Sequence, residues 1–526
     1  MWIATAEQCK KNDLDASEVY GIPPIVLIER AGLAVFENIK QLLPTGGKIV
    51  IVAGKGNNGA DGLAVSRLAI EYNYHIDVLI TALEDELGSD CRTQLMLARA
   101  QGVRPIFCDD ARYARKMECL GAFDLIIDAI LGIGGSGALH GSVQCAISKI
   151  NRSGVPVISV DVPSGICTDT GADLGDSVWA LRTVTFGLPK PCLFQGIGLE
   201  HAGYWSVADI GYPSPLLQNP TDARVTSPQW VLDVIPERLR IVHKRDCGHV
   251  LVVAGSKTMP GAAVLACQGA LRSGAGVVTI ASCRTTLETV WRHLPEVIGL
   301  ELPCDLEGNL AGNAAEVLLE TMDRVDSAVF GPGMGQSSQT HKFLEAVWEN
   351  WNTPSCIDAD ALNAVANGLK LPDCEAVLTP HPGEMGRLLG CSVAEIQSDR
   401  FATVRQAVDI LKRTVILKGA HSITGSDEMP LIVNSTGNSG MATAGMGDVL
   451  SGIVGTFLAQ DLTPYLAAAA GTYLHGLAGD ECAQNMGPVG FTASDVALKL
   501  PQSRAKLSGT CSTRSRVQSL PPSCSL

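Results

Sequence analysis

Short runs of β-branched and other apolar residues alternate along this chain with longer amphipathic stretches. In the first half these runs lie at 49–52, 78–80, 125–127, 157–160 and 184–186. The stretches between them, such as 61–72 and 89–101, carry apolar residues at helical spacing. Because parallel strands need a helix-sized connection, this alternation predicts a parallel sheet with helices on both faces.

A proline-rich break separates two copies of this pattern. Residues 212–228 hold four prolines and little periodicity, which is typical of a linker. Further apolar runs follow the break, at 250–253, 277–280, 328–330, 376–378 and 415–417. Since 526 residues are too many for one ordinary core, we expect an α/β protein with two three-layer αβα domains.

The break and the composition of the last residues set the predicted domain boundaries. We place the N-terminal domain at 1–215, the linker at 216–234 and the C-terminal domain at 235–506. Residues 507–526 are rich in Ser and cannot bury enough apolar surface to order themselves. We therefore expect a disordered tail there.

The net charge and the hydropathy of the chain argue against some classes of binding partner. The formal net charge of −14 argues against a nucleic-acid or anionic-membrane surface, because either would need a basic face. No apolar run approaches the ~18 residues of a membrane span. The first thirty residues hold five acidic side chains and no apolar core segment, so we expect no signal peptide and a cytoplasmic protein.

The 17 cysteines are scattered, with no Cys-x-x-Cys pair and no histidine at metal-ligand spacing. Positions such as Cys267, Cys356 and Cys391 stand among apolar or small residues, where Cys behaves as a small buried hydrophobe. We expect reduced, structural cysteines, as is usual in the cytosol.

The segment 438–452 combines small residues with the start of an apolar helical run, and reads Asn-Ser-Gly-Met-Ala-Thr-Ala-Gly-Met-Gly-Asp-Val-Leu-Ser-Gly. Small residues let the backbone approach a ligand, and a helix N-terminus attracts an anion. Asp448 lies in the first turn, where it could accept a proton from a hydroxyl that attacks a phosphate. Taken alone, it could equally be a helix-start acid that the dipole favours.

Four predicted strand ends carry polar or glycine-rich motifs. These are Gly331-Pro332-Gly333-Met334-Gly335, Asp358-Ala359-Asp360-Ala361-Leu362-Asn363, Thr379-Pro380-His381-Pro382-Gly383-Glu384 and Lys418-Gly419-Ala420-His421-Ser422. Ligands bind at the carboxyl ends of the strands in open α/β sheets, and a Lys and a Gly there can meet nucleotide phosphates. The coincidence predicts an active site at this edge.

Together these motifs resemble the ADP-dependent NAD(P)H-hydrate dehydratases, a branch of the ribokinase-like superfamily, over about residues 235–500. The resemblance implies transfer of the terminal phosphoryl group of ADP to the C6 hydroxyl of the hydrated nicotinamide, followed by release of AMP and phosphate. Mg²⁺ would neutralise charge on the phosphoryl group. Because fused two-domain members of the family usually use ADP, the resemblance implies ADP rather than ATP. The residues implied to contact the hydrated cofactor are Ala262, Gly333, His381 and Asp448. Those implied to hold ADP are Lys418, Gly419, Ala420, His421, Ser422 and Gly447.

The first predicted strand ends in a glycine-rich turn at 53–62, and we expect a helix to begin at about Leu63. Such a turn can bind an anion, although a purely structural turn is an equally good interpretation. It is not a Walker loop, because no Gly-Lys-Ser/Thr precedes the helix. Asn58, Asp128 and Ser164 bear oxygens that could converge on a hard monovalent cation, which oxygen ligands alone do not identify.

With the motifs at 5–8, 20–23 and 29–32, this half resembles the NAD(P)H-hydrate epimerases over about residues 1–215, which implies a Rossmann-like domain. Asn58, Asp128 and Ser164 are then implied to bind K⁺. Asp161 is the candidate acid or base, with a ligand-orienting carboxylate as the alternative. The residues implied to contact the substrate are Asn57, Asn58, Gly59, Ala60, Asp61, Gly132, Ile133, Gly134, Gly135, Ser136, Gly137, Ala138 and Asp161.

Two stretches depart from the epimerase pattern. Ala60 stands where the family usually has a second Gly, which would stiffen the turn. Residues 134–140 read Gly-Gly-Ser-Gly-Ala-Leu-His instead of a Gly-Leu-x-Arg form, so a basic residue that could meet a phosphate is missing.

The two motif sets on one chain predict a bifunctional enzyme that epimerises the R form of NADHX or NADPHX to the S form and dehydrates the S form. One alternative is a vitamin or sugar kinase of the same superfamily with a regulatory N-terminal half, which would release a stable phosphorylated product. Another is an N-terminal half that only senses nucleotides or docks a partner. We expect a homo-oligomer without nucleic-acid or membrane partners.

Overall fold

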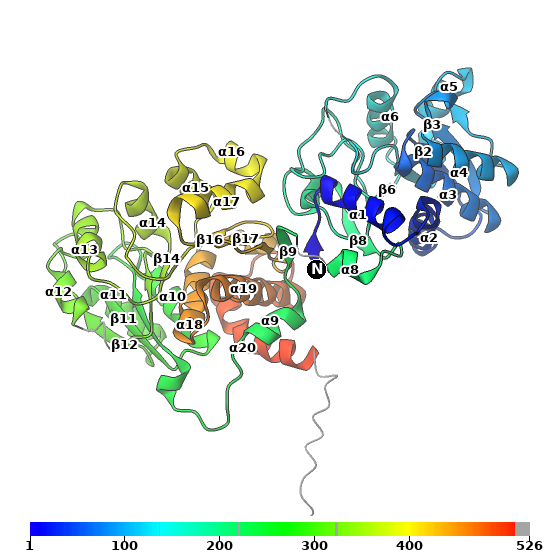
Figure 1. Ribbon diagram of the computed structural model, residues 1–526. Coiled ribbons are helices and arrows are strands. Elements are labelled where there is room, and N and C mark those ends of the chain that lie inside the picture. The colour runs from blue at the N-terminus through cyan, green and yellow to red at the C-terminus, as the bar shows by residue number, and fades with distance from the viewer. Residues whose placement is uncertain (136, 219–220, 321–324, 511–526) are drawn as a thin grey trace, which may run out of the picture. The chain divides into compact units, whose positions relative to one another are not determined.

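The computed structural model describes residues 1–135, 137–218, 221–320 and 325–510. The chain folds into two compact units (Figure 1). The first comprises Met1–Arg224 with Gln397–Arg400, and the second comprises Val225–Ile396 with the chain from Phe401 onward. Each unit has its own sheet and its own core.

The first unit is built on a seven-stranded parallel sheet in the order β4-β3-β2-β5-β6-β7-β8. Its strands are β2 (Lys48–Ala53), β3 (His75–Ile80), β4 (Ile106–Phe107), β5 (Leu125–Ala129), β6 (Val157–Val160), β7 (Arg182–Phe186) and β8 (Tyr204–Ala208). The chain moves outward from β2 to β4 and then returns to β5. The carboxyl ends of β2 and β5 therefore flank the topological switch point, where open α/β sheets bind ligands.

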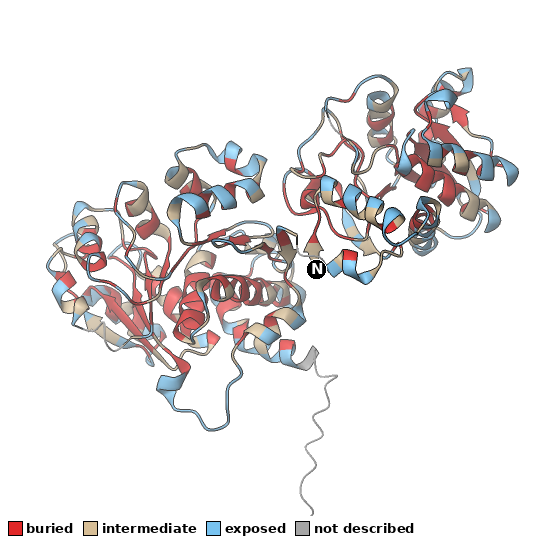
Figure 2. Cartoon of the chain, viewed as in Figure 1, coloured by how far each residue is buried: buried red, intermediate tan, exposed pale blue. Residues whose placement is uncertain are grey.

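Helices cover both faces of this sheet. They are α1 (Ala6–Glu18), α2 (Pro24–Leu42), α3 (Asn57–Glu71), α4 (Ser89–Ala100), α5 (Ala111–Glu118), α6 (Gly141–Arg152), α7 (Gly198–His201) and α8 (Ser214–Gln218). Ile49 and Ile51 of β2 belong to the core cluster with α2, α3 and α4, whereas Val50 and Val52 belong to the cluster with α5 and α6. This alternation, with strands buried on both faces (Figure 2), confirms the predicted three layers.

The sheet of the second unit is mostly parallel, in the order β16-β15-β14-β13-β10-β11-β12. Its strands are β10 (His249–Val253), β11 (Val277–Ser282), β12 (Ile298–Glu301), β13 (Ser327–Phe330), β14 (Ser355–Ile357), β15 (Ala376–Leu378), β16 (Thr414–Leu417), β17 (Ile423–Gly425) and β18 (Leu431–Val433). The prediction of a wholly parallel sheet is wrong at one edge, because β17 and β18 are antiparallel to their neighbours. The turn 418–422 between β16 and β17 is too short for a parallel crossover.

The second unit also has three layers. Its helices are α9 (Pro228–Val234), α10 (Pro260–Ser273), α11 (Arg284–His293), α12 (Ala314–Leu319), α13 (Ser338–Trp348), α14 (Ala359–Ala366), α15 (Pro382–Leu389), α16 (Val393–Ser398), α17 (Arg400–Leu411), α18 (Met446–Ala459), α19 (Pro464–Met486) and α20 (Ala493–Thr510). Val250 and Val252 of β10 lie in the core cluster with α10, α18 and α19, and Leu251 and Val253 lie in the cluster with α12, α13 and α14. The predicted α/β class holds for both units.

Two predicted boundary segments contain regular structure. The linker placed at 216–234 includes β9 (Ala223–Val225) and helix α9, and β9 pairs antiparallel with β1 (Trp2–Ile3). Helix α20 continues through Thr510, so the beginning of the tail predicted at 507–526 is helical. The remainder of that tail, 511–526, lies outside the described residues.

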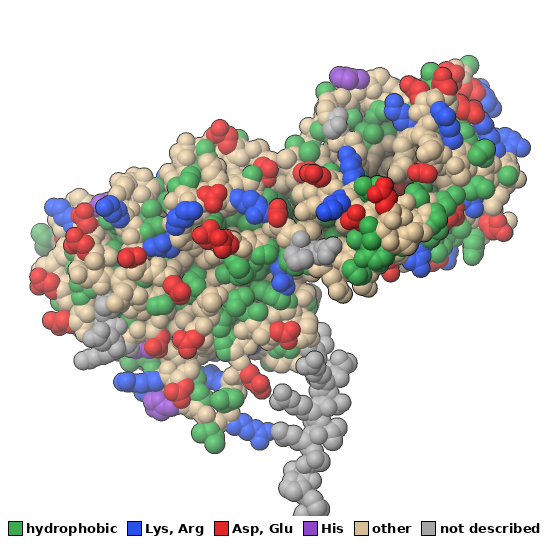
Figure 3. Space-filling view, viewed as in Figure 1, with side chains coloured by type: hydrophobic (Ala, Val, Ile, Leu, Met, Phe, Trp, Pro, Cys, Tyr) green, Lys and Arg blue, Asp and Glu red, His purple; other side chains and the backbone are tan. Residues whose placement is uncertain are grey.

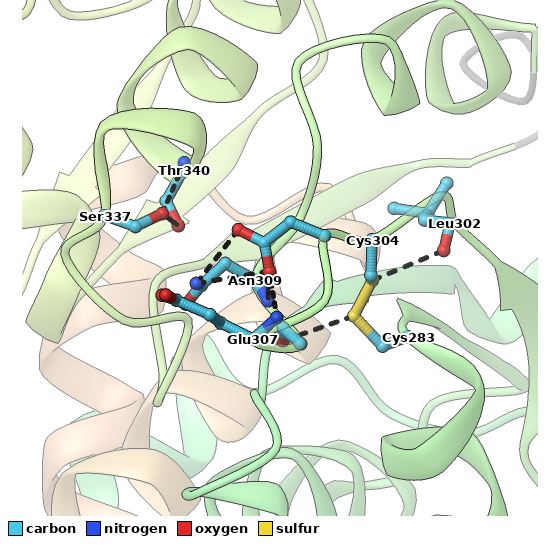
Figure 4. The surroundings of a disulfide bond; sticks show 9 residues. Cys283, Leu302, Cys304, Glu307, Asn309, Ser337 and Thr340 are labelled. Atoms are coloured by element: carbon cyan, nitrogen blue, oxygen red, sulfur yellow. Dashed lines mark hydrogen bonds between the residues drawn. A yellow bond between two sulfur atoms is a disulfide. The ribbon is translucent and has the colours of Figure 1, made fainter.

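Cys283 and Cys304 form a disulfide (Figure 4), with their Cα atoms 5.9 Å apart. The expectation of reduced cysteines is wrong for this pair. Cys283 follows β11 and Cys304 lies shortly after β12, and these adjacent parallel strands bring the two cysteines within bridging distance. Cys267, Cys356 and Cys391 are free thiols, as predicted.

The surface carries charges of both signs. On the face drawn in Figure 3, acidic and basic side chains are interspersed rather than gathered into a basic face. Within the described part of the chain, no helix combines the length and apolar character that crossing a membrane requires.

Helices α10 and α18 pack with their backbones in contact. A Cβ on Gly269 would lie 2.3 Å from the carbonyl oxygen of Val449, and one on Gly452 would lie 2.1 Å from that of Ala266. Real Cβ atoms cannot approach so closely, so both positions require glycine. This contact fixes the start of α18, which carries Asp448, against α10, which carries Ala262.

Gly452→Ala should lower the free energy of unfolding of the second unit by about 1–3 kcal/mol, because the added methyl group forces α10 and α18 apart. Chemical denaturation of the purified protein measures this change. Gly312→Ala is the matched control, since the nearest atom to its added Cβ, on Lys342, would be 3.7 Å away. The control should change stability by less than about 0.5 kcal/mol. Equal effects of the two variants would contradict the role of the helix contact.

Candidate active sites

A cavity of about 640 Å³ lies at the carboxyl ends of β2, β5 and β6 in the first unit. Cys9, Asp13 and Ser17 of α1 form one of its walls. A capping box begins this helix: Thr5 Oγ1 accepts a hydrogen bond from the Gln8 N–H, and the Thr5 N–H donates to Gln8 Oε1. The motif at 5–8 is thus a helix start that positions this wall.

The glycine-rich turn after β2 becomes helical sooner than predicted. Helix α3 begins at Asn57 rather than near Leu63. The glycines are needed for close backbone approach, since a Cβ on Gly59 would lie 2.0 Å from the carbonyl oxygen of Gly54. Ala60 is buried in the first turn of this helix, where Ala is the most favourable residue. Its departure from the family pattern therefore does not stiffen a loop.

The cavity gathers about half of the predicted substrate contacts. Those that line it are Asn57, Asn58, Asp61, Gly132, Ile133, Gly134 and Asp161. Those described but not lining it are Gly59, Ala60, Gly135, Gly137 and Ala138. Ser136 lies outside the described residues.

Asp161 follows β6 directly and has a left-handed backbone, with φ of 66°. Its Oδ1 accepts hydrogen bonds from Lys190 Nζ at 2.5 Å, Thr185 Oγ1 at 3.1 Å and the Phe186 N–H at 3.1 Å. Lys190 is 1% exposed. Burial alone would lower the pKa of Lys190, but the charge and hydrogen bond of Asp161, together with Cys9 and Cys192, raise it. The two side chains form a buried ion pair, and the strained backbone of Asp161 is of a kind that concentrates at functional sites.

Lys190, Tyr212 and Asp13 are among the residues of this cavity that sequence reasoning missed. Lys190 stands in Gly-Leu-Pro-Lys-Pro just after β7, and a lysine between prolines beyond a strand end is the signal that could have found it. Tyr212 Oη donates a hydrogen bond to Asp13 Oδ1, and both side chains line the cavity. Burial raises the pKa of Asp13, and the Tyr212 hydroxyl partly offsets this shift.

Asp128 and Ser164, two of the predicted cation ligands, are in contact. Asp128 is fully buried and accepts hydrogen bonds from Ser164 Oγ at 2.5 Å, the Ser164 N–H at 2.9 Å and Ser159 Oγ at 2.8 Å. Burial raises its pKa in spite of these donors. The third ligand, Asn58, contacts Gly132, and its Nδ2 is buried without a partner among the described residues.

Asp448 lies in the first turn of α18, as predicted, after Gly445 in the left-handed conformation. Its carboxyl is partly buried. Burial, and then the nearby Asp358, raise the pKa of Asp448 to about 7, although Lys418 acts in the opposite direction. A carboxyl with this pKa can both accept and release a proton near neutral pH.

Lys418, which is partly buried, and the buried Asp358 form a second ion pair. Lys418 Nζ lies 2.7 Å from Asp358 Oδ1, and Ser451 Oγ donates to Asp358 Oδ2 at 2.5 Å. Burial alone would raise the pKa of Asp358, but Lys418 overrides it and lowers the pKa. Glu384 Oε2 lies 3.8 Å from the same Nζ. Asp358, Glu384 and Ser451 were absent from the predicted contacts, although the first two stand in motifs at the ends of β14 and β15.

The predicted ADP-binding residues lie in two places that meet at Lys418. A Cβ on Gly447 would lie 3.3 Å from Lys418 Nζ, so the N-terminus of α18 adjoins this lysine. The residues after Lys418 form the tight turn to β17, in which Ser422 Oγ bonds to the Gly419 N–H at 3.3 Å. His421 is turned toward the protein, with Nδ1 at 2.8 Å from the carbonyl oxygen of Asn434, and Ala420 is exposed.

Ala262 and Gly333, two of the predicted cofactor contacts, adjoin each other. A third, His381, is linked to Lys418 through Glu384. A Cβ on Gly333 would lie 2.8 Å from that of Ala262, so these residues form one surface. His381 caps α15, and its Nδ1 accepts a hydrogen bond from the Gly383 N–H at 3.0 Å. His381 Nε2 lies 3.5 Å from Glu384 Oε1. Glu384 thus lies between His381 and Lys418.

One histidine near this edge had no sequence signal. His475, on α19, is buried, and its Nε2 has no partner among the described residues. Burial, followed by the charge of Lys418, lowers the pKa of His475 to about 4. Its ring is therefore neutral at physiological pH, and it adds no positive charge beside Lys418.

Two family models match the chain, one in each half. A model described as NAD(P)H-hydrate dehydratase matches residues 250–502, and one described as YjeF-related protein N-terminus matches residues 24–192. A crystal structure of ADP/ATP-dependent NAD(P)H-hydrate dehydratase from Bacillus subtilis, co-crystallised with ATP/Mg²⁺, is 27% identical with a TM-score of 0.47. It covers 53% of this chain and 97% of that chain.

Relatives named bifunctional NAD(P)H-hydrate repair enzyme Nnr match nearly the whole chain. The one from Moorella thermoacetica is 37% identical over 509 residues, which cover 95% of this chain and 96% of the relative. The one from Escherichia coli is 34% identical over 493 residues, which cover 93% and 92%. Because the identity extends across both units, this chain belongs to the family of bifunctional NAD(P)H-hydrate repair enzymes.

Proposed function

We propose that this chain repairs hydrated nicotinamide cofactors in two steps. The N-terminal unit interconverts the R and S forms of NADHX and NADPHX, and the C-terminal unit dehydrates the S form with ADP. One observation carries the proposal: each unit holds a Lys–Asp pair with a buried aspartate, and another carboxyl group beside it, at the carboxyl edge of its sheet. Family membership supplies the substrate. The cytoplasmic location and the homo-oligomeric state stay predictions.

Dehydration needs a better leaving group than hydroxide, and phosphate is one. We infer that Asp448 removes the proton of the C6 hydroxyl while the hydroxyl oxygen attacks the terminal phosphorus of ADP. The bond between that phosphorus and AMP breaks, and AMP leaves with the bonding electrons. Loss of phosphate from C6 and of a proton from C5 then restores NAD(P)H.

The nucleotide phosphates are best accommodated between Lys418 and the start of α18. Free N–H groups at Gly447 and the ammonium of Lys418 both attract phosphate, and the pairing with Asp358 holds this lysine in place beforehand. Glu384, beside Lys418, carries carboxylate oxygens, which are suitable ligands for Mg²⁺, and the bound ion would neutralise phosphate charge. ADP rather than ATP follows from the family resemblance.

In the N-terminal unit, Asp161 is best suited to act on the substrate. Only its Oδ1 takes part in the internal hydrogen bonds, and the residue lines the cavity. The other carboxylate oxygen is thus left to orient the hydrated ring or to accept a proton from a water that adds to C6. The ammonium of Lys190 stabilises the negative charge that this role needs.

The chemistry of Asn58, Asp128 and Ser164 fits the K⁺ site implied by the resemblance. Asp128 is a buried carboxyl whose raised pKa shows that its charge is undercompensated, and a cation would offset this. Rotating the unpartnered amide of Asn58 would offer its oxygen as a ligand. Ser164 Oγ also accepts a hydrogen bond from the Leu131 N–H at 2.8 Å, so the ion would steady the segment 131–134 that borders the cavity.

Asp448→Asn should lower kcat for dehydration by about 10²–10⁴-fold, because an amide cannot accept the hydroxyl proton. The measurement is recovery of absorbance at the NADH wavelength from S-NADHX with ADP and Mg²⁺. Epimerisation by the same variant should be unaffected, and a thermal melt is the folding control for the C-terminal unit. A rate within about tenfold of the wild type would refute the role of Asp448. A stable phosphorylated alcohol from the wild type would instead favour a kinase.

The dehydration rate should rise with pH up to about 7 and level off above it. A general base works only when ionised, and burial with the nearby Asp358 raises the pKa of Asp448 to that value. On the acid side, kcat should fall by about tenfold per pH unit. The check is kcat at saturating substrate across the neutral range. A rate that does not vary there would argue against Asp448 as the base.

Asp161→Asn should abolish epimerisation and leave dehydration of the S form intact. With a mixture of R- and S-NADHX, the wild type should convert both forms, whereas the variant should stop when the S form is used up. The end-point absorbance measures this. The double variant Asp161→Asn, Lys190→Met removes the buried charge together with its partner, and should be equally inactive but folded. Full conversion by either variant would exclude an essential role for Asp161.

A further inference from the structure

Four carboxyl groups line the cavity of the N-terminal unit: those of Asp13, Asp61, Asp90 and Asp161. Lys190 is the one buried lysine among the described residues that line it. The other lining lysines, at 10 and 55, are exposed to solvent. One buried positive charge therefore faces four acids.

The hydrogen-bond donors in the cavity are shared unequally among these acids. Asp161 receives the Lys190 ammonium and two further donors. Asp13 receives the hydroxyl of Tyr212. Asp61 is 7% exposed and has no hydrogen-bond partner among the described residues. Asp90 is partly exposed to water, so the buried Asp61 is the acid whose negative charge would be least compensated.

Electrostatics then decides which acid keeps its proton. Like charges in a poorly solvated cavity disfavour each other, so the acid without a donor is protonated first. Burial, followed by Asp161 and Asp13, raises the pKa of Asp61 well above its ordinary value. The helix dipole does little to oppose this, because Asp61 lies beyond the first turn of α3, where the effect falls off.

We propose that Asp61 is the general acid of the epimerase half-reaction and acts together with Asp161, which lines the same cavity. The inference rests on the proposed function. It gives Asp61 a role in proton transfer, in addition to the substrate contact that the family resemblance implies. It gives the N-terminal unit one group that delivers a proton and one that receives it.

The step balances as follows. The Asp61 proton moves to the C6 hydroxyl, the C6–O bond breaks, and water leaves with the bonding electrons. The lone pair of the ring nitrogen forms a C6=N bond, and the cation is stabilised by the Asp161 carboxylate. Water then adds to the opposite face of C6 and gives its extra proton to Asp161. Proton transfer from Asp161 to Asp61 restores the starting state, and the net change is inversion at C6.

Asp61→Asn tests this role because asparagine keeps the size and a hydrogen-bond donor but cannot release a proton. Epimerase kcat is measured on R-NADHX. An excess of the variant Asp161→Asn, which should dehydrate S-NADHX but not epimerise, reports the S-NADHX that forms. In Asp61→Asn this kcat should fall by about 10²-fold or more. In the wild type, kcat should fall as the pH rises and Asp61 loses its proton, and this alkaline decrease should be absent from the residual activity of the variant. Asp109→Asn, on the surface of the same unit and away from the cavity, is the matched control and should match the wild type.

The outcomes separate the role of Asp61 from the function of the unit. Dehydration of S-NADHX by Asp61→Asn reports intact folding of the other half, and a thermal melt reports that of the N-terminal unit. If the wild type epimerises and Asp61→Asn keeps kcat within about threefold, or changes only KM, the acid role is overturned while the proposed function stands. If the wild type does not epimerise R-NADHX at all, the proposed function of the unit fails, and the acid role fails with it.

Discussion

A lysine that is withdrawn from water, fully or in part, needs a counter-charge, and each unit meets this constraint with a buried aspartate that directly follows a parallel strand. Lys190 pairs with Asp161 after β6, and Lys418 pairs with Asp358 after β14. Because a lone buried charge costs several kcal/mol, each pair requires the surrounding strand ends and loops to hold their positions. The lysines arrive by different routes, one from the loop after β7 and the other from the end of β16. Two differently ordered sheets thus share one electrostatic arrangement.

Each ion pair also shapes the behaviour of a neighbouring acid. In the C-terminal unit the charge of Lys418 is largely taken up by Asp358, and the pKa of Asp448 is raised by burial and by that same aspartate. In the N-terminal unit the charge of Lys190 is balanced by Asp161, and the pKa of Asp61 is raised by burial and then by Asp161. The lysine therefore supports one aspartate, and the next carboxyl is free to hold or exchange a proton. In the proposed mechanism, this division of roles supplies both units with a carboxyl group for acid–base chemistry.

Periodicity predicted the layers well, because strands such as β2 and β10 are continuous apolar runs with buried residues on both faces. It missed β17 and β18, since each is three residues long and a hairpin leaves no helical period between strands. The motifs located Asp448, Lys418 and Asp161 because they stand at strand or helix ends. Lys190 and Asp358 were missed as functional partners because pairing depends on side-chain reach in three dimensions. The Cys283–Cys304 disulfide was missed for the same reason, since its spacing resembles no motif.

The glycine contact between α10 and α18 has a consequence for motion. Where two backbones touch at Gly269 and Gly452, no layer of side chains remains that could slide or change rotamers. The two helices therefore move as one rigid body, and the distance between Ala262 and Asp448 is preserved. Any movement that admits or releases a ligand must then occur outside these two helices.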